Sequence, residues 1–267
     1  MDLKKLLVGS IVAGFYTTTA FAAQNYSDIL NKLIPPTISY KVKVEKNSQL
    51  KGFDQLNVSI IQKKTGTVYH RYLWVSKDKT KIIPVLLENK NGRIVRVKPQ
   101  QSVERIPVDI SWLNNLLKKL PSWAKKSIGE GREVYLFSDP LCPFCKRELP
   151  KLLKLAENKK IKLHVLPFDV HGPQAKKGSA VFLDIEKKKG LKEALNKVEL
   201  ANFGDVEKMA STKEAAELLK KYSKVLDEIQ NAAAKAGING TPAMLIKTSK
   251  DKGYLILGLT DITPYIK

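Results

Sequence analysis

The chain has 267 residues, a formal net charge of +21 at pH 7 and only two cysteines, which lie three positions apart. Two such close cysteines exclude the disulfide-stapled scaffold of small secreted domains, and the length suits two modest domains. The charge would suit a nucleic-acid partner, but acidic residues alternate with the lysines in segments such as residues 213–228, as on a solvated helical face, so we expect no nucleic acid among its partners.

The first residues have the form of a cleaved export signal. Lys4 and Lys5 precede an apolar run from Leu6 to Phe15, and the stretch from Ala20 to Ala22 is an A-x-A cleavage pattern. The alternative is a membrane anchor, but a run of about ten residues is far shorter than the roughly 20 that span a bilayer. We therefore expect residues 1–22 to be a signal peptide, cleaved near Ala22, and the mature protein to be periplasmic.

Residues 23–105 are predicted to form a small, sheet-rich α+β domain. A short helix from Ser27 to Leu33 comes first and is closed by the prolines that follow it. Segments rich in β-branched and aromatic residues come next, and Asn91-Gly92 has the composition of a hairpin turn. The four predicted strands are Thr37 to Val44, Asn57 to Gln62, Val68 to Val75 and Ile82 to Leu87.

A linker helix is predicted for residues 106–130, after a boundary segment from Pro99 to Pro107. Ser111 has the character of a helix cap, and Pro121 ends or kinks the helix. The apolar residues between them form one stripe, which fits burial in a core and a subunit contact equally well. That stripe consists of Trp112, Leu113, Leu116, Leu117 and Leu120.

From residue 131 the pattern changes to strand, helix, strand, which predicts a parallel pair of strands joined by a crossover helix. A mostly helical stretch at about residues 174–236 follows, and two more strands come after it. Residues 131–267 are therefore predicted to be an α/β domain with a helical insertion. The predicted elements are the strand Glu133 to Ser138, the helix Cys142 to Asn158 and the strands Ile161 to Phe168, Ala243 to Lys247 and Tyr254 to Leu257.

The two cysteines, Cys142 and Cys145, stand where a strand gives way to a helix. The unpaired N–H groups and the positive dipole end of the helix should stabilise a thiolate on Cys142, while Cys145 lies one turn further on the same face. Pro143 fits the first turn, and Phe144 completes a Cys-Pro-Phe-Cys motif. We predict a redox-active pair in which Cys142, exposed and of low pKa, attacks a disulfide and the buried Cys145 resolves the mixed disulfide.

Two other roles for the cysteine pair are open. A structural disulfide that closes so short a ring would add only about 2 kcal/mol, against about 4.7 kcal/mol for a 100-residue loop. A zinc site needs four ligands, and only His164 and His171 lie near the two sulfurs in the sequence. We therefore favour redox chemistry, and expect neither a metal nor a bound cofactor.

A second motif, Gly240-Thr241-Pro242-Ala243, comes directly before a strand near the C-terminus. Together with the cysteine motif it resembles the thioredoxin superfamily, in which a cis-proline loop lies beside the cysteine pair. The resemblance implies a thioredoxin-like fold, in which Thr241 and Pro242 bind an extended client peptide as an added strand. It also implies an active-site helix that continues, with a kink, through Pro150. The alternative is a helix end at Leu149, but an apolar stripe continues on both sides of the proline and favours the kink; it consists of Leu149, Leu152, Leu153 and Ala156.

The plan of signal peptide, small N-terminal domain, linker helix and catalytic domain with a helical insertion is similar to the periplasmic disulfide isomerases of the DsbC and DsbG type. The resemblance implies a homodimer formed by residues 23–105, clients that are unfolded or misoxidised exported proteins, and a membrane electron donor of the DsbD type. A dithiol oxidase of the DsbA type would use the same residues in the opposite direction. A periplasmic chaperone that binds unfolded clients without using its sulfurs is a further alternative.

Two positions depart from the pattern of these families. The dipeptide Pro143-Phe144 lacks the histidine that strongly oxidising members carry before the second cysteine, so one source of thiolate stabilisation is missing. Leu136 stands where thioredoxin-like domains often bury a carboxyl group for proton transfer to the second cysteine. Water, or Asp139 if it folds back, would then accept this proton, although Asp139 is better suited to cap the turn.

Overall fold

The computed structural model describes residues 26–36, 38–45, 50–96 and 103–266. The predicted signal peptide of residues 1–22, with its cleavage site near Ala22, lies outside the described residues. The chain divides into two compact units, Met1–Ile106 and Pro107–Lys267. Among the described residues, the first unit has one hydrophobic cluster and the second unit has two.

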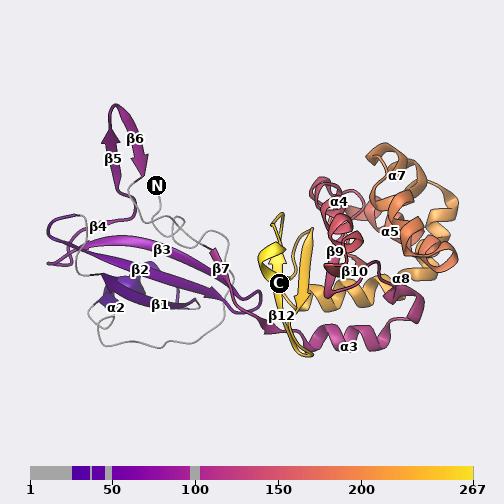
Figure 1. The fold of residues 1–267 in the computed structure, drawn as a ribbon, viewed down its shortest axis with the longest axis horizontal. Coiled ribbons are helices and arrows are strands. Elements are labelled where there is room, and N and C mark those ends of the chain that lie inside the picture. The colour runs from indigo at the N-terminus through magenta and orange to yellow at the C-terminus, as the bar shows by residue number, and fades with distance from the viewer. Residues whose placement is uncertain (1–25, 37, 46–49, 97–102, 267) are drawn as a thin grey trace. The chain divides into compact units, whose positions relative to one another are not determined.

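The first unit is an antiparallel sheet with one helix packed against it (Figure 1). Its main elements are α2 Ser27–Leu33, β1 Ser39–Glu45, β2 Phe53–Gln62, β3 Thr67–Ser76, β4 Ile82–Ile83 and β7 Val103–Arg105. The strand order is β1-β2-β3-β4, and β7 also pairs with β3. Side chains of a strand alternate between the two faces of a sheet, so Leu56, Val58 and Ile60 of β2 are all buried with Leu30 of α2.

The prediction of one strand from Ile82 to Leu87 is wrong. β4 ends at Ile83, and the next strand begins only at Leu87. The reason is Pro84, because a proline has no N–H group to donate to a strand ladder and is tolerated only at the edges of sheets. The prediction relied on the β-branched residues before this proline and did not account for the effect of the proline on strand pairing.

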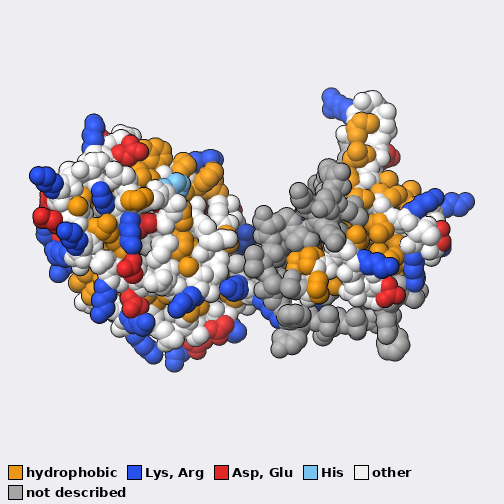
Figure 2. Space-filling model, turned by 180° about the vertical axis from the view of Figure 1, so that it is seen from behind, with side chains coloured by type: hydrophobic (Ala, Val, Ile, Leu, Met, Phe, Trp, Pro, Cys, Tyr) orange, Lys and Arg blue, Asp and Glu red, His pale blue; other side chains and the backbone are white. Residues whose placement is uncertain are grey.

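A separate two-stranded hairpin follows, made of β5 (Leu87–Lys90) and β6 (Arg93–Arg96) (Figure 1). Asn91 and Gly92 join its strands with φ angles of 54° and 79°, so the hairpin turn predicted from this dipeptide is confirmed. The hairpin projects from its unit with hydrophobic side chains at its surface (Figure 2), and Leu87 and Ile94 are 58% and 65% exposed. A hairpin of two strands is only marginally stable alone in water, so this one presents apolar surface that a partner could cover.

The second unit is built on a five-stranded mixed sheet with the order β10-β9-β11-β12-β8. The strands are β8 Val108–Asp109, β9 Arg132–Ser138, β10 Ile161–Pro167, β11 Ala243–Lys247 and β12 Lys252–Leu257, and the helix α4 Pro143–Glu157 connects β9 to β10. β9 and β10 are parallel, whereas β11 is antiparallel to both β9 and β12. The predicted parallel pair and the two later strands are thus present.

Between β10 and β11 the chain is helical, in the region predicted as an insertion at about residues 174–236. Its elements are α5 Gly172–Lys189, α6 Leu191–Ala194, the π-helical turn η3 Leu195–Glu199, α7 Phe203–Ala210 and α8 Lys213–Lys235. A short 3-10 turn, η4 Thr263–Tyr265, follows the last strand. No helix among the described residues combines the length and the apolarity that crossing a membrane requires.

Within residues 106–130 the helix α3 covers only Ser111–Lys119, and a 3-10 turn, η2 Ser122–Lys125, comes after Pro121. Ser111 is the first helical residue rather than the cap; its N–H group donates to Asp109. The apolar stripe of α3 is buried in the core of the second unit, alongside residues of β9 and α8. Its buried members are Leu113, Leu116 and Leu120.

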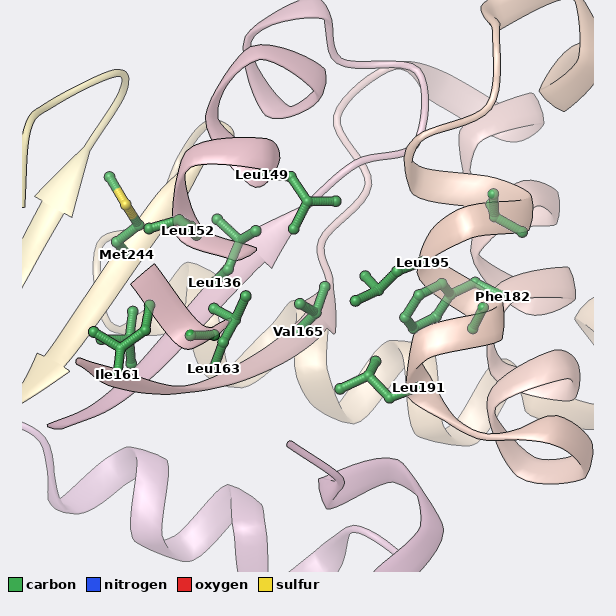
Figure 3. Packing of buried hydrophobic residues seen from close by; sticks show 14 of the residues in the cluster. Leu136, Leu149, Leu152, Ile161, Leu163, Val165, Phe182, Leu191, Leu195 and Met244 are labelled. Atoms are coloured by element: carbon green, nitrogen blue, oxygen red, sulfur yellow. The ribbon is translucent and has the colours of Figure 1, made fainter. Parts of the chain in front are cut away.

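The central strand β9 is buried on both faces, because helices cover both sides of the sheet. Leu136 meets Leu149 and Leu152 of α4 on one face (Figure 3), and the insertion joins the same cluster through Leu195, which lies between Val165 and Phe182. α4 continues through Pro150, as the apolar stripe on both sides of the proline predicts. The insertion therefore belongs to the core that positions the start of α4.

Candidate active site

The turn between β9 and α4 is organised by Asp139, which is fully buried. Its Oδ1 atom accepts a hydrogen bond of 2.7 Å from the N–H group of Leu141. Its Oδ2 atom accepts from the N–H groups of Val170 and His171, at 2.7 and 2.9 Å, and pairs with the His171 ring at 2.9 Å. Asp139 thus caps the turn and ties the segment after β10 to it.

The two cysteines follow this turn. Cys142 is the N-cap residue of α4, Cys145 lies in its first turn, and both are free thiols. The Cys142 sulfur lies 3.4 Å from the carbonyl oxygen of Thr241, to which its protonated form donates a hydrogen bond, and the Thr241–Pro242 peptide bond is cis. The predicted exposure of Cys142 is wrong, since each cysteine is only 1% exposed. The Thr241 loop lies against the Cys142 sulfur. Because Thr241 is 99 residues away in the sequence, the geometry of the helix start alone did not predict that Cys142 is covered.

Exposure does not distinguish the two sulfurs, but their electrostatic surroundings do. The Cys145 thiol donates a hydrogen bond to the Cys142 sulfur, which lowers the pKa of Cys142 to about 5. The N–H groups of Phe144 and Cys145 strengthen this effect, and burial opposes it. The same thiol–sulfur bond, together with burial, raises the pKa of Cys145. At neutral pH the pair therefore carries one thiolate, on Cys142.

We expect alkylation of the reduced protein to be selective for Cys142. Its relative rate should rise as the pH is raised through about 5 and be constant near neutrality, because the thiolate is the reacting form. Peptide mass spectrometry after iodoacetamide treatment at a series of pH values measures this. The Cys142→Ala variant gives the background rate of Cys145, and modification of Cys145 before Cys142 at neutral pH would contradict the assignment.

The remaining predicted residues are also placed. Pro143 is the first residue of α4, where its missing N–H group costs no hydrogen bond. Phe144 is 49% exposed and forms an apolar surface beside the pair. The two histidines named as possible zinc ligands have other contacts: His164 stacks on Tyr135 with 4.3 Å between ring centroids, and the His171 ring contacts the carboxyl group that caps the turn.

The sequence interpretation missed two charged residues at this site. Glu199, from η3, is buried and accepts a hydrogen bond from Ser138, the residue before Asp139. Lys146, the residue after Cys145, donates to the carbonyl oxygen of Glu199 at 3.0 Å. The sequence holds a signal for Glu199, which comes four residues after buried Leu195 on the same helical stripe. An acidic residue on an apolar stripe indicates a buried partner.

The strand order of the second unit, the helix directly after β9 and the cis proline before β11 define a thioredoxin-like domain that carries a dithiol pair. No protein-family model and no curated protein sequence matches the chain. Among solved structures, it is similar to the catalytic domain of ScsC from Proteus mirabilis, with 24% identity and a TM-score of 0.42 over 57% of this chain and 90% of that one.

Two further similar structures are a thioredoxin-like oxidoreductase from Silicibacter pomeroyi and a periplasmic thioredoxin-like protein from Salmonella enterica serovar Typhimurium. The first has 19% identity and a TM-score of 0.45, covering 56% of this chain and 91% of that one. The second has 19% identity and a TM-score of 0.42, covering 55% of this chain and 90% of that one.

Proposed function

We propose that the protein is an exported, periplasmic thiol:disulfide interchange protein that isomerises or reduces non-native disulfides in envelope proteins. The observation that carries this proposal is the geometry at Cys142. Its sulfur lies at the N-terminus of α4, has a pKa lowered to about 5 by hydrogen bonding from Cys145, and contacts the backbone of Thr241. A sulfur with a lowered pKa, a second thiol and a backbone carbonyl group are thus adjacent, and thiol–disulfide exchange needs a nucleophile, a resolving thiol and a surface for the client.

In this mechanism the Cys142 thiolate attacks one sulfur of a client disulfide and forms a mixed disulfide, and the other client sulfur leaves as a thiolate. The mixed disulfide is resolved by another client thiol, which completes an isomerisation, or by Cys145, which reduces the client and leaves the pair oxidised. The backbone beside Pro242 would hold the client segment as an added strand. No bound cofactor takes part, since the electrons move between sulfur atoms.

The proposal includes a homodimer formed by residues 23–105. The β5–β6 hairpin supports it, because Leu87 and Ile94 are exposed on a two-stranded sheet that needs cover. A second copy of the chain would bury these side chains and hold a misfolded client while other disulfide pairings form. An electron donor of the DsbD type in the membrane would return the oxidised pair to the dithiol form.

Deletion of residues 23–105 is expected to separate the two activities. The second unit has its own cores, so the shortened protein should fold as a monomer and still reduce a small disulfide. It should lose most of its isomerisation of a scrambled multi-disulfide protein, because that activity needs a held client. Sedimentation and the two assays measure this. A monomeric full-length protein, or equal isomerisation by the shortened one, would refute the isomerase proposal.

A dithiol oxidase is the second candidate, and one observation favours it. A pKa of about 5 on Cys142 stabilises the reduced pair, which makes the oxidised pair a stronger oxidant. Alkylation of thiols in intact cells before lysis distinguishes the two candidates. A reduced pair at steady state agrees with an isomerase or reductase, and an oxidised pair agrees with an oxidase.

A further inference from the structure

A buried carboxyl group from the helical insertion lies at the active-site turn. Glu199 ends η3 and is only 1% exposed. Its Oε2 atom accepts a hydrogen bond of 2.6 Å from the hydroxyl group of Ser138, the last residue of β9. Its Oε1 atom is buried and has no hydrogen-bond partner among the residues that the structure describes. Burial of a polar atom without a partner costs stability, so this oxygen is retained at a cost to the fold.

Lys146, on the active-site helix α4, binds the turn that contains Glu199. Its Nζ atom donates to the backbone carbonyl oxygens of Glu199 and Ala201, the first at 3.0 Å. The same ammonium group lies 5.0 Å from the ring centroid of Phe203, at the start of α7. Because these bonds go to backbone carbonyls, the lysine holds Glu199 beside the cysteine helix and leaves its Oε1 atom available.

Other buried carboxyl groups near the pair are occupied. Asp139 accepts hydrogen bonds from three backbone N–H groups and pairs with an imidazole ring. Asp169 accepts a hydrogen bond of 2.5 Å from the hydroxyl of Ser179. Glu148 of α4 is buried and pairs with Lys151 at 3.0 Å, and the Leu136 side chain offers no acceptor. Among the described residues whose charges act on this site, Glu199 has the buried oxygen that is free to take a proton.

The resolving step needs such an acceptor, since Cys145 must lose its proton before it attacks. Its hydrogen bond to Cys142 and its burial raise the pKa of Cys145, and the charge of Glu199 adds to the rise. On the basis of the function proposed above, we propose that Glu199 accepts the proton of Cys145, directly or through one water molecule, as Cys145 attacks the mixed disulfide.

In this step the Cys145 sulfur bonds to the Cys142 sulfur, and the bond between Cys142 and the client sulfur breaks. The client leaves as a thiolate and takes a proton from solvent. The pair becomes oxidised to a disulfide, and over the two exchange steps its two electrons pass to the two client sulfurs. In the reverse direction the protonated Glu199 returns its proton to the departing Cys145 thiolate.

The groups that face Glu199 place its titration near neutrality. Burial raises the pKa of Glu199 to about 7, and the charges of Asp139 and Asp169 contribute to the rise. The hydrogen bond from Ser138 and the charge of Lys146 act in the opposite direction. A carboxyl group that titrates near neutral pH can both accept and release a proton under working conditions.

The Glu199→Gln variant of the full-length protein tests this role. Reduced protein mixed with dithiobis(nitrobenzoate) releases a coloured thiolate twice: the first release reports attack by Cys142, and the second reports resolution by Cys145. We expect Glu199→Gln to slow the second release about 100-fold and to leave the first unchanged. The wild-type rate of the second release should increase through about pH 7, and the variant should lose this inflection.

Two further variants separate proton transfer from structural support. Glu199→Asp keeps a carboxyl group and should recover part of the second rate and the pH inflection. Glu186→Gln, which removes a buried carboxyl group of α5 facing Lys126, should change neither release. An unchanged second release in Glu199→Gln, or one slowed with its pH inflection intact, overturns the role of Glu199. Absence of the first release from wild-type protein would instead overturn the exchange function itself.

Discussion

Replacing Cys145 with alanine is expected to trap the protein on its clients as mixed disulfides. The substitution removes the Cys145 hydrogen bond, which lowers the pKa of Cys142 most, but Cys142 would still attack because the backbone N–H groups of residues 144 and 145 at the start of α4 remain to favour its thiolate. The intramolecular thiol that normally releases the client would be absent, so the adduct would persist. Non-reducing gels of cell extracts should show a ladder of adducts that disappears on reduction.

The Cys142→Ala variant is the matched comparison for this experiment. It should form no ladder, because the pKa of the remaining Cys145 thiol is raised and this thiol carries no stabilised thiolate. A double variant without either sulfur gives the background. Ladders of equal strength from the two single variants would contradict the assignment of Cys142 as the attacking group.

Asp139→Ala is expected to destabilise the protein by at least about 4.5 kcal/mol. The substitution would leave the buried N–H groups of Leu141, Val170 and His171 without their acceptor, and hydrogen bonds to charged groups are each worth about 1.5–3 kcal/mol. The turn that holds Cys142 would also loosen, so disulfide exchange should weaken in parallel. Urea unfolding monitored by circular dichroism measures the change in stability.

The surface variant Asp227→Ala is the control for Asp139→Ala. Asp227 pairs with Lys176 at 2.8 Å, and both side chains are substantially exposed, so its loss should cost no more than about 0.5–1 kcal/mol. Asp139→Asn, which keeps one acceptor oxygen, should lie between the two. Equal unfolding midpoints for wild type and Asp139→Ala would show that the turn does not depend on this carboxyl group.

Local patterns were sufficient to predict much of the second unit. The alternation of strand and helix placed β9, α4 and β10, and the apolar stripe on both sides of Pro150 showed that α4 continues through it. These elements are predictable because each is encoded within a few consecutive residues. The contact between the segments of Cys142 and Thr241, by contrast, was expected only from the resemblance to the thioredoxin superfamily, and the structure has this contact.

The features that were missed depend on contacts between distant segments. Cys142 is buried in contact with the Thr241 loop, which lies 99 residues away in the sequence, and Glu199 ends a π-helical turn, a rare element that the sequence pattern did not predict. The break between β4 and β5 at Pro84 is different, because it could have been predicted from the sequence: a proline inside a predicted strand argues against that strand. For Glu199, charge on an apolar stripe was a usable signal, although its partner Ser138 could not be inferred from it.

The two-residue strand β8 has a consequence for any dissection of this protein. Asp109 and Val108 pair with Lys252 and Gly253 of β12, and the adjacent N–H group of Ile110 donates to Asp251. Where the chain enters the second unit, it therefore pairs with part of the outer edge of β12. A version that begins beyond Ile110 would expose that edge to pairing with other molecules, and its aggregation would reflect an opened strand rather than any native assembly.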